Sequence, residues 1–275
     1  MNLKRLAAAA ALSVAALSGG TAHATNVALE LALVIDVSGS VDPTEFNLQR
    51  NGYAAAFQNA TIGSAIASFS GSGGIAVGVY FFANNVMQAV SWTQLTSAAD
   101  AFAFGTTLGG LSEPLSTNAA IGIAGTTLGS ATNIAEGMDR AREGMAANSF
   151  TGTRLVMDVS GDGIQNTTRN GEATCLGLGC VDDLQAARDA AALAGIVVNG
   201  LAITDDVATL DAYYAANLQS GIGSFVLDTT FATFSTAVAT KIGREITGTV
   251  PEPTSLALAG LALAGLGAAR RRRAA

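Results

Sequence analysis

Strongly apolar runs alternate with helical patterns along the middle of the sequence, and this alternation restricts the fold more than any other feature. The first run, Ala28 to Ile35, has the continuous apolar character of a strand covered on both faces. Further strands are expected at Ile75 to Phe82, Val86 to Trp92, Arg154 to Val159, Ile196 to Ile203 and Ser224 to Leu227, and helices at Pro43 to Phe57, Ile134 to Ala147, Asp182 to Ala194 and on either side of the last strand. This order predicts an α/β fold with a doubly wound, mostly parallel sheet and helices on both faces.

Short motifs mark where these elements begin and turn. Asp42-Pro43-Thr44-Glu45 combines an N-cap, a proline at the first helical position and a glutamate placed for a capping box. Asn84-Asn85 turns the chain between the second and third strands, so we expect a hairpin and one antiparallel edge strand. The glycine-rich stretch Gly71 to Gly78 enters a strand instead of following one into a helix, which indicates a turn and not a dinucleotide-binding loop.

The first 24 residues have the order of a secretory signal peptide. Lys4 and Arg5 precede an apolar stretch from Leu6 to Leu17, which is too short to span a bilayer, and Ala22-His23-Ala24 supplies the small residues of a cleavage site. Cleavage after Ala24 leaves residues 25–249, a length that one α/β domain fills. The sequence therefore predicts an exported protein.

Residues 250–275 form a second distinctive end. Pro251-Glu252-Pro253 is followed by an uncharged stretch from Ser255 to Ala269 and by four arginines at 270–273. The arginines are expected to stay cytoplasmic, which places the domain on the periplasmic side of the inner membrane. This end resembles the PEP-CTERM sorting signal of Gram-negative bacteria, which implies processing by an exosortase, often in species that make exopolysaccharide, and release to the cell surface or matrix. A plain membrane anchor that is never cut is the alternative.

The charge balance of the expected mature domain excludes one class of partner. Residues 25–249 contain twenty Asp and Glu against eight Lys and Arg, a formal charge of −12, whereas the whole chain carries −7. Binding to the phosphates of nucleic acid requires a basic surface, so nucleic acid is not an expected partner.

Cys175 and Cys180 are separated by only four residues. An oxidising exported compartment favours a local disulfide between them. A zinc site is disfavoured because residues 25–249 contain no histidine to complete four ligands. Free thiols remain the alternative, since sequence does not give their geometry.

Oxygen-bearing side chains lie next to the ends of three of the expected elements. Asp36, Ser38 and Ser40 stand at alternate positions after the first strand. Thr132 precedes the helix that begins at Ile134, and Asp162 follows the strand Arg154 to Val159. Ligands bind at the carboxyl ends of parallel strands, and hard cations such as Mg²⁺ prefer oxygen ligands. The serines on their own could serve only as caps or turns, but three such loops at one sheet edge favour a metal site.

These residues resemble the metal-ion-dependent adhesion site (MIDAS) of the von Willebrand factor A (vWA) family. The resemblance covers roughly residues 28–247 and implies that Asp36, Ser38, Ser40, Thr132 and Asp162 bind a divalent cation, Mg²⁺ first, with Mn²⁺ or Ca²⁺ as alternatives. Three phrases, Asp158 to Gly163, Asn199-Gly200-Leu201 and Leu210 to Tyr214, resemble more narrowly a bacterial branch known only as a domain of unknown function.

Asp158 departs from the pattern of the adhesive relatives, because it is an acid within an expected buried strand. Two interpretations are open. Asp158 could orient a metal ligand through hydrogen bonds, or backbone amides could satisfy its carboxylate.

In the resembling family, the ion keeps an open position that an anionic oxygen of a partner fills. The implied function is exported, metal-dependent binding of an acidic group on a protein or polysaccharide, without enzyme activity. A metal-assisted envelope hydrolase or phosphatase is the first alternative, with Asp36 as nucleophile or base. It is disfavoured because Ser38 stands where aspartyl phosphatases place a second aspartate. A structural matrix protein that needs the ion only for stability is the other alternative.

Overall fold

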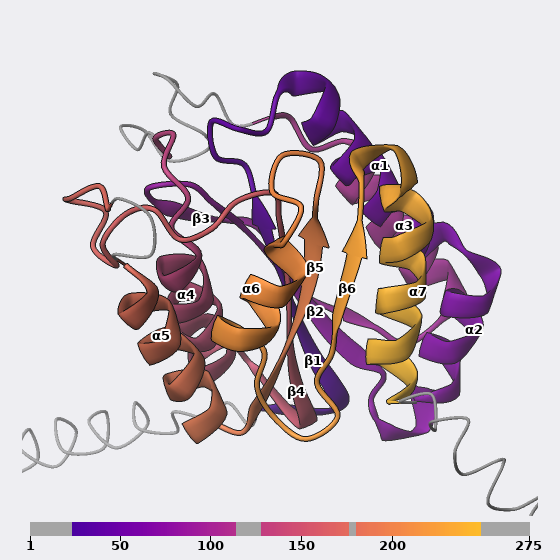
Figure 1. Ribbon diagram of the computed structural model, residues 1–275. Coiled ribbons are helices and arrows are strands. Elements are labelled where there is room, and N and C mark those ends of the chain that lie inside the picture. Colours follow the sequence, from indigo (N-terminus) through magenta and orange to yellow (C-terminus); the bar gives the residue numbers. More distant parts are fainter. Residues whose placement is uncertain (1–23, 114–127, 176–179, 249–275) are drawn as a thin grey trace, which may run out of the picture.

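A six-stranded sheet in the order β3-β2-β1-β4-β5-β6 runs through the middle of the computed structural model, which describes residues 24–113, 128–175 and 180–248 (Figure 1). The strands are β1 (Thr25–Asp36), β2 (Ile75–Phe82), β3 (Val86–Leu95), β4 (Phe150–Gly161), β5 (Ile196–Ile203) and β6 (Val226–Thr229). Only the β2–β3 pair is antiparallel, and β3 lies at one edge. The expected doubly wound sheet with one antiparallel edge strand is confirmed.

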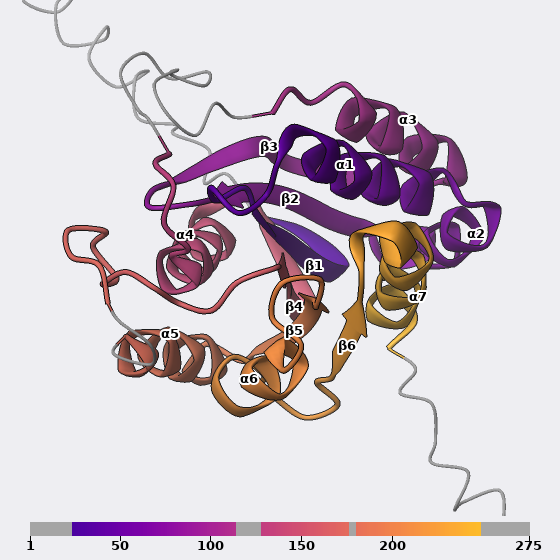
Figure 2. The same ribbon diagram turned by 45° about the horizontal axis from the view of Figure 1, so that its top comes forward.

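Helices cover both faces of this sheet, as Figure 2 shows. One face carries α1 (Pro43–Gln58), α2 (Ala60–Ser68), α3 (Ala98–Gly109) and α7 (Phe234–Thr247), and the other carries α4 (Ile134–Ala147), α5 (Val181–Leu193) and α6 (Leu210–Asn217). Leu31 and Leu33 of β1 pack into the first core cluster, whereas Ala32 and Val34 pack into the second. Alternate residues of a strand point to opposite faces, so an apolar β1 serves two cores at once.

The register of β1 decides where functional groups gather. Asp36, the last residue of β1, is opposite Phe82 of β2, and the preceding Ile35 is opposite Ser160 of β4. The carboxyl ends of β1 and β4 therefore finish side by side at the centre of the sheet. In open α/β sheets, ligands bind at this edge.

Several local predictions are confirmed. The side chain of Asp42 accepts hydrogen bonds from the Thr44 and Glu45 backbone amides at 2.6 and 2.9 Å, and Glu45 accepts one from the Asp42 amide at 2.8 Å, which completes the capping box of α1. Gly73 and Gly74 have φ angles of 83° and 73°, and they form the turn that leads into β2. Such positive φ angles are readily adopted only by glycine.

The two cysteines form a disulfide just before α5, as the sequence indicates. Helices α2 and α3 are additions to the expected set. Both begin at side-chain caps, because Asn59 accepts from the Thr61 amide at 2.8 Å and Ser97 accepts from the Asp100 amide at 3.1 Å. Strand β6 begins two residues later than expected, at Val226.

The two ends of the chain carry predictions that lie outside the described residues. These are the signal peptide, of which only Ala24 is described, and the sorting segment of residues 250–275. Within residues 24–113, 128–175 and 180–248, no helix has both the length and the apolar character needed to cross a bilayer.

Candidate metal centre

Asp36 is the last residue of β1 and lies at the sheet edge where the strands end. Its side chain is fully buried. Its Oδ1 accepts a hydrogen bond from the Ser38 backbone amide at 2.8 Å, which bends the following loop back over the carboxylate. From α1, Gln49 Nε2 donates to the Asp36 carbonyl oxygen at 3.2 Å. Two bonds thus fix the Asp36 backbone and one of its carboxylate oxygens.

The three hydroxyls and the second carboxylate lie together above Asp36. Ser38 Oγ is 3.2 Å from Ser40 Oγ and 3.2 Å from Thr132 Oγ1, and Ser40 Oγ donates to Asp162 Oδ1 at 2.7 Å. The structure therefore brings all five expected ligands into one cluster. Four of them are buried and Ser40 is exposed, so the cluster opens to solvent on the Ser40 side.

Backbone contacts hold the loop of Thr132 against its neighbours. The Gly39 amide donates to the Ser130 carbonyl at 2.9 Å, which ties the loop after β1 to the loop before α4. Asn166 Oδ1 accepts from the Thr132 amide at 2.8 Å, and the Asn166 amide donates to the Thr132 carbonyl at 3.1 Å. Asn84 Oδ1 accepts from the Ala131 amide at 2.6 Å. Sequence reasoning did not identify Asn166 as part of the site, and it took Asn84 only as a turn residue.

Gly161, the last residue of β4, makes room for the Asp36 carboxylate. A Cβ atom at this position would lie 2.7 Å from Asp36 Oδ2 and 2.8 Å from the Tyr214 hydroxyl. Tyr214 is fully buried on α6 and donates to the Gly163 carbonyl at 3.3 Å, which supports the loop that carries Asp162. Gly161 and Tyr214 lie within the family-like phrases of the sequence, which give no indication of these roles.

The electrostatics of the cluster favour a bound cation. Burial, and then the negative charge of Asp162, raise the pKa of Asp36 to about 8. Burial also raises the pKa of Asp162, even though the Ser40 hydroxyl lowers it. Among the described residues, neither Asp36 Oδ2 nor Asp162 Oδ2 has a hydrogen-bond partner, and both oxygens are buried. Buried carboxylate oxygens are normally paired, so these two orphans fit a divalent ion held among the five side chains.

The chemistry of the donors agrees with that fit. The cluster supplies two carboxylates and three hydroxyls, all oxygen, which suits hard cations such as Mg²⁺, Mn²⁺ or Ca²⁺. Across the described ranges, no three His, Cys, Asp or Glu side chains gather as they do in carboxylate-rich or zinc-type centres. A site at Asp36 would therefore rest on serine and threonine oxygens for more than half of its protein ligands.

Asp158 does not take either of the two expected roles. Its Oδ1 accepts from the Tyr53 hydroxyl at 3.2 Å and lies 2.6 Å from Lys241 Nζ, so its partners are side chains of α1 and α7. Residues alternate along β4, and Asp158 points into the core beneath α7, away from the five ligands. Nothing in the sequence pattern links Asp158 to a lysine far along the chain.

Comparison with known proteins agrees with the observed fold. Residues 26–250 match the model of a family described as "Protein of unknown function (DUF1194)", and residues 249–273 match the PEP-CTERM protein-sorting motif. No curated protein matches the chain.

Solved structures with a similar fold include two pilus proteins and a matrix protein of the mussel byssus. The vWF domain of the type V pili tip protein Mfa5 from Porphyromonas gingivalis has 12% identity and a TM-score of 0.51, over 84% of this chain and 100% of that chain. The PilB minor pilin from Streptococcus sanguinis has 11% identity and a TM-score of 0.54, over 81% of this chain and 62% of that chain. Proximal thread matrix protein 1 from the mussel byssus has 15% identity and a TM-score of 0.53, over 80% of this chain and 47% of that chain.

The chain thus spans less than two thirds of the pilin and less than half of the byssus protein. At these identities the likeness establishes the fold, which is that of a vWA domain. The family match, in contrast, covers most of the sequence. The chain belongs to the family described as "Protein of unknown function (DUF1194)" and carries a PEP-CTERM protein-sorting motif at its C-terminal end.

Proposed function

We propose that this protein binds one divalent cation, Mg²⁺ first, at Asp36, Ser38, Ser40, Thr132 and Asp162, and that the ion binds an acidic group of a partner at the cell envelope. The observation that carries the proposal is a pair of buried carboxylate oxygens, Asp36 Oδ2 and Asp162 Oδ2, that have no hydrogen-bond partner within the part of the chain that the structure describes. A buried pair of like charges is costly unless a cation offsets it.

Neutral ligands suit an ion that has to attract an outside anion. Hydroxyl oxygens of Ser38, Ser40 and Thr132 coordinate without adding negative charge, so the carboxylates of Asp36 and Asp162 bring the site to neutrality without a net negative charge that would repel an outside anion. The exposed position of Ser40 leaves one side of the cluster open to a partner. A zinc-occupied MIDAS motif in a structure of the mussel byssus protein supports cation binding by this fold.

We propose an extracellular role in adhesion for two reasons, which are the proteins that have a similar fold and the sorting motif. The similar structures include a pilus adhesin from Lactobacillus rhamnosus GG and a pilus tip protein. The PEP-CTERM motif supports export, processing by an exosortase and attachment at the inner membrane before any release. We propose that the protein is not an enzyme, and that its partner remains bound and unchanged.

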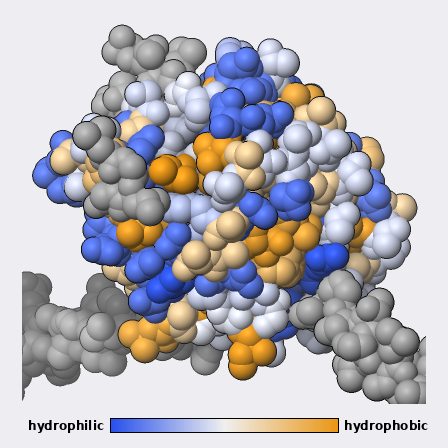
Figure 3. Space-filling view, in the orientation of Figure 1, coloured by the Kyte–Doolittle hydropathy of each residue, from blue (hydrophilic) through white to orange (hydrophobic). Residues whose placement is uncertain are grey.

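The carboxylates around the opening favour a protein partner over an acidic polysaccharide. Burial, and after it the charges of Glu45 and Asp206, raise the pKa of Asp162, and burial, and after it the charge of Asp42, raise the pKa of Glu113. We call Glu45 and Asp206 the acidic rim of the site. Hydrophilic residues gather over the start of α1 at the top of Figure 3. A partner that presents a carboxylate among basic residues gains from this rim, whereas a uniformly anionic polymer is repelled.

The test is calorimetric titration of the purified protein with Mg²⁺, Mn²⁺ and Ca²⁺. We expect one binding site in the wild type and none in a Ser38→Ala, Ser40→Ala double variant. A matched control is Ser64→Ala with Ser68→Ala, two exposed serines of α2, which should bind like the wild type. Equal binding by all three proteins would overturn the metal proposal.

A second experiment separates adhesion from a purely structural role of the ion. Pull-down from the envelope of the producing organism, with and without chelator, should yield a partner only when the ion is present. The byssus neighbour is a matrix protein by description, so a structural role is the serious rival. If chelation lowered thermal stability and no partner were captured in either condition, the structural role would replace adhesion.

A further inference from the structure

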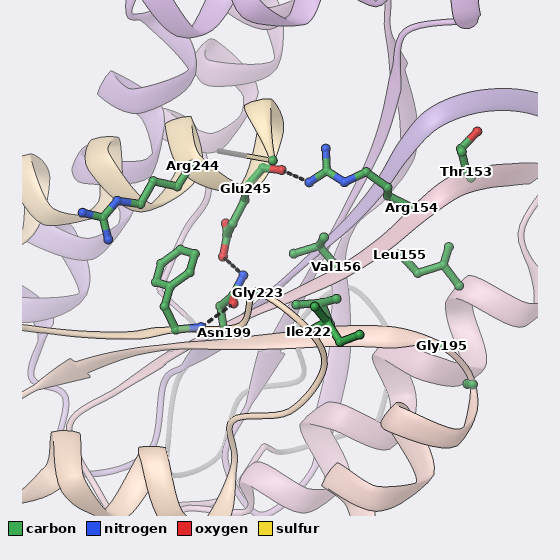
Figure 4. Close-up of a pocket in the computed structure, with 15 residues that line it drawn as sticks. Thr153, Arg154, Leu155, Val156, Gly195, Asn199, Ile222, Gly223, Arg244 and Glu245 are labelled. Atoms are coloured by element: carbon green, nitrogen blue, oxygen red, sulfur yellow. Dashed lines mark hydrogen bonds between the residues drawn. The ribbon is translucent and has the colours of Figure 1, made fainter. Parts of the chain in front are cut away.

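A second cluster of titratable groups lies buried between α7 and the sheet, separate from the cation site. Lys241 Nζ is 2.6 Å from Asp158 Oδ1 and 2.7 Å from Glu245 Oε1, and the side chains of all three residues have no exposed surface. Asn199 of β5 donates to Glu245 Oε1 at 2.9 Å. Figure 4 shows Glu245 reaching from α7 toward Asn199.

The choice of lysine at this position is unusual for the chain. Lys241 is the only lysine between residues 25 and 249, where the other seven cationic side chains are arginines. Arginine is the residue better suited to buried ion pairs, because its charge is delocalised and weakly hydrated. A lysine amine differs in one respect that matters here, since it can lose its proton and act as a nucleophile.

The ion pairs of Lys241 do not complete the hydrogen bonding of the two carboxyl groups in this cluster. Asp158 Oδ2 and Glu245 Oε2 are buried and have no hydrogen-bond partner in residues 24–113, 128–175 and 180–248. Burial, and then the charge of Asp158, raise the pKa of Glu245 to about 8. The free energy lost when charged groups are removed from water is recovered only when the ion-pair geometry is good and all hydrogen bonds are made. The hydrogen bonds of these two carboxyl groups are not complete.

We propose that Lys241 and Asp158 condense to an intramolecular amide bond that joins α7 to β4. Nζ attacks Cγ of Asp158, a bond forms between Nζ and Cγ, and the bond from Cγ to the unpartnered Oδ2 breaks. An ammonium and a carboxylate become a neutral amide and one water, so the atoms and charges balance without any further reactant. Condensation removes two buried charges and one orphan oxygen.

The neighbouring side chains stand where this step needs them. Tyr53 donates to Asp158 Oδ1 at 3.2 Å and so stabilises negative charge on that oxygen while Nζ adds. Burial raises the pKa of Tyr53 well above its usual range, so its hydroxyl keeps its proton. Glu245 Oε1 contacts Nζ and can carry the two protons that leave the nitrogen, one after the other, to the leaving oxygen, which departs as water. Glu245 and Asn199 also line a cavity of about 420 Å³ next to this cluster (Figure 4).

Asp158 is a better acceptor than the nearby carboxamide of Asn199. Both ends of that carboxamide are engaged, since its Nδ2 donates to Glu245 and its Oδ1 accepts from the Phe225 amide at 3.1 Å. Asp158, in contrast, contacts Nζ directly. The bond would tie the helix that leads into the C-terminal sorting segment to a central strand, so a pull on that segment would be borne covalently.

The test is intact-mass measurement of the purified exported protein with its disulfide preserved. We expect a mass lower than that of the disulfide-bonded sequence by one water. After denaturation, an amine-acylating reagent should modify the N-terminal amine and leave Lys241 unmodified. Trypsin should not cleave after Lys241, and the peptide between Arg154 and Arg169 should emerge joined to the one that contains Lys241. A full mass with an acylated Lys241 would overturn the proposal, and loss of ammonia instead of water would overturn the choice of Asp158.

A variant with a side chain of nearly the same size tests the role of Glu245. Glu245→Gln keeps the size of the side chain and an acceptor for Asn199, but it cannot carry a proton between nitrogen and oxygen. We expect the variant to fold and to show the full mass, while Glu143→Gln on the exposed side of α4 loses one water as the wild type does. Loss of water from Glu245→Gln to the wild-type extent would show that Glu245 takes no part in the step.

Discussion

Ser40 Oγ, in the loop after β1, donates a hydrogen bond of 2.7 Å to Asp162 Oδ1, in the loop after β4, across 122 positions of sequence. This one contact joins the two carboxylate-bearing loops of the candidate site. The second carboxylate oxygen of Asp162, Oδ2, takes no part in this contact and has no hydrogen-bond partner among the described residues. The fold therefore holds the two loops in place, but it leaves a buried carboxylate oxygen of the site without a hydrogen bond.

Replacing Asp36 by asparagine should separate these two aspects. The amide is neutral, so the repulsion from Asp162 disappears and the metal-free variant should melt at or above the wild-type temperature. Cation binding, which needs the charge of Asp36, should be lost. A ligand that binds only the folded state at roughly 100 times its Kd stabilises it by about 2.7 kcal/mol. Thermal unfolding with and without Mg²⁺ should show this gain in the wild type and not in Asp36→Asn.

Asp189→Asn is the matched control for that change. Asp189 pairs with Arg188 at the surface of α5, with its side chain 68% exposed, and exposed pairs of this kind contribute little. Its response to Mg²⁺ should equal that of the wild type. An Mg²⁺-dependent gain that survived in Asp36→Asn would contradict a role for Asp36 as a ligand.

The stability of the metal-free protein should depend on pH through Asp36. Its folded-state pKa is about 8, above the ordinary value of 3.8, so between these values the folded state holds a proton that the unfolded state lacks. The stabilising contribution is fully present below about pH 4 and is lost as the pH rises through about 8. In chelator, the melting temperature of the wild type relative to Asp36→Asn should therefore fall across this window.

Mg²⁺ should act against that fall because it competes with the proton for Asp36. Its apparent affinity, measured by calorimetry, should weaken as the pH is lowered from about 8. An affinity that did not change over this range would show that Asp36 is already ionised in the folded protein.

The sequence predicted the positions of the ligands well because parallel strands end at a common edge. Asp36 and Asp162 each follow a recognisable apolar strand, and Thr132 precedes a recognisable helix, so topology alone brings them together. The same logic gives no information about Asn166, which holds the Thr132 loop through amide contacts at 2.8 and 3.1 Å. An asparagine in a loop has no periodic signature.

Buried charge pairs were the least predictable feature. Asp158 was recognised as a buried acid, but its partner Lys241 lies 83 positions further along the chain, on a helix whose position was known only approximately. Helices α2 and α3 were also missed. The caps at which they begin, Asn59 and Ser97, were the signals that could have found them.

The acidic rim should decide which partners bind. In Mg²⁺, the wild type should bind a peptide with one glutamate flanked by lysines more tightly than a polyuronate, and added salt should weaken the peptide complex. Neutralising the rim with Glu45→Gln and Asp206→Asn should reduce this preference. A control pair, Glu143→Gln with Asp189→Asn, removes the same charge elsewhere on the surface. Tighter binding of the polyuronate by the wild type would show that the rim does not select the partner.

Two glycine-to-alanine changes should have opposite effects on stability. At Gly161, the added Cβ would lie 2.7 Å from Asp36 Oδ2 and 2.8 Å from the Tyr214 hydroxyl. Something must shift, and overpacking of this kind costs about 1–3 kcal/mol. Because the displaced group is the carboxylate of Asp36, Gly161→Ala should also weaken Mg²⁺ binding.

Gly243 provides the comparison, since it lies inside α7 and nothing stands within 4 Å of an added Cβ. Gly243→Ala should stabilise the protein by about 0.5–1 kcal/mol through the higher helix propensity of alanine, and Mg²⁺ binding should not change. Urea unfolding and calorimetry of both variants measure the two effects. If Gly161→Ala bound Mg²⁺ with wild-type affinity, the Asp36 carboxylate would not need its observed position, and the proposed cation site would lose its geometric basis.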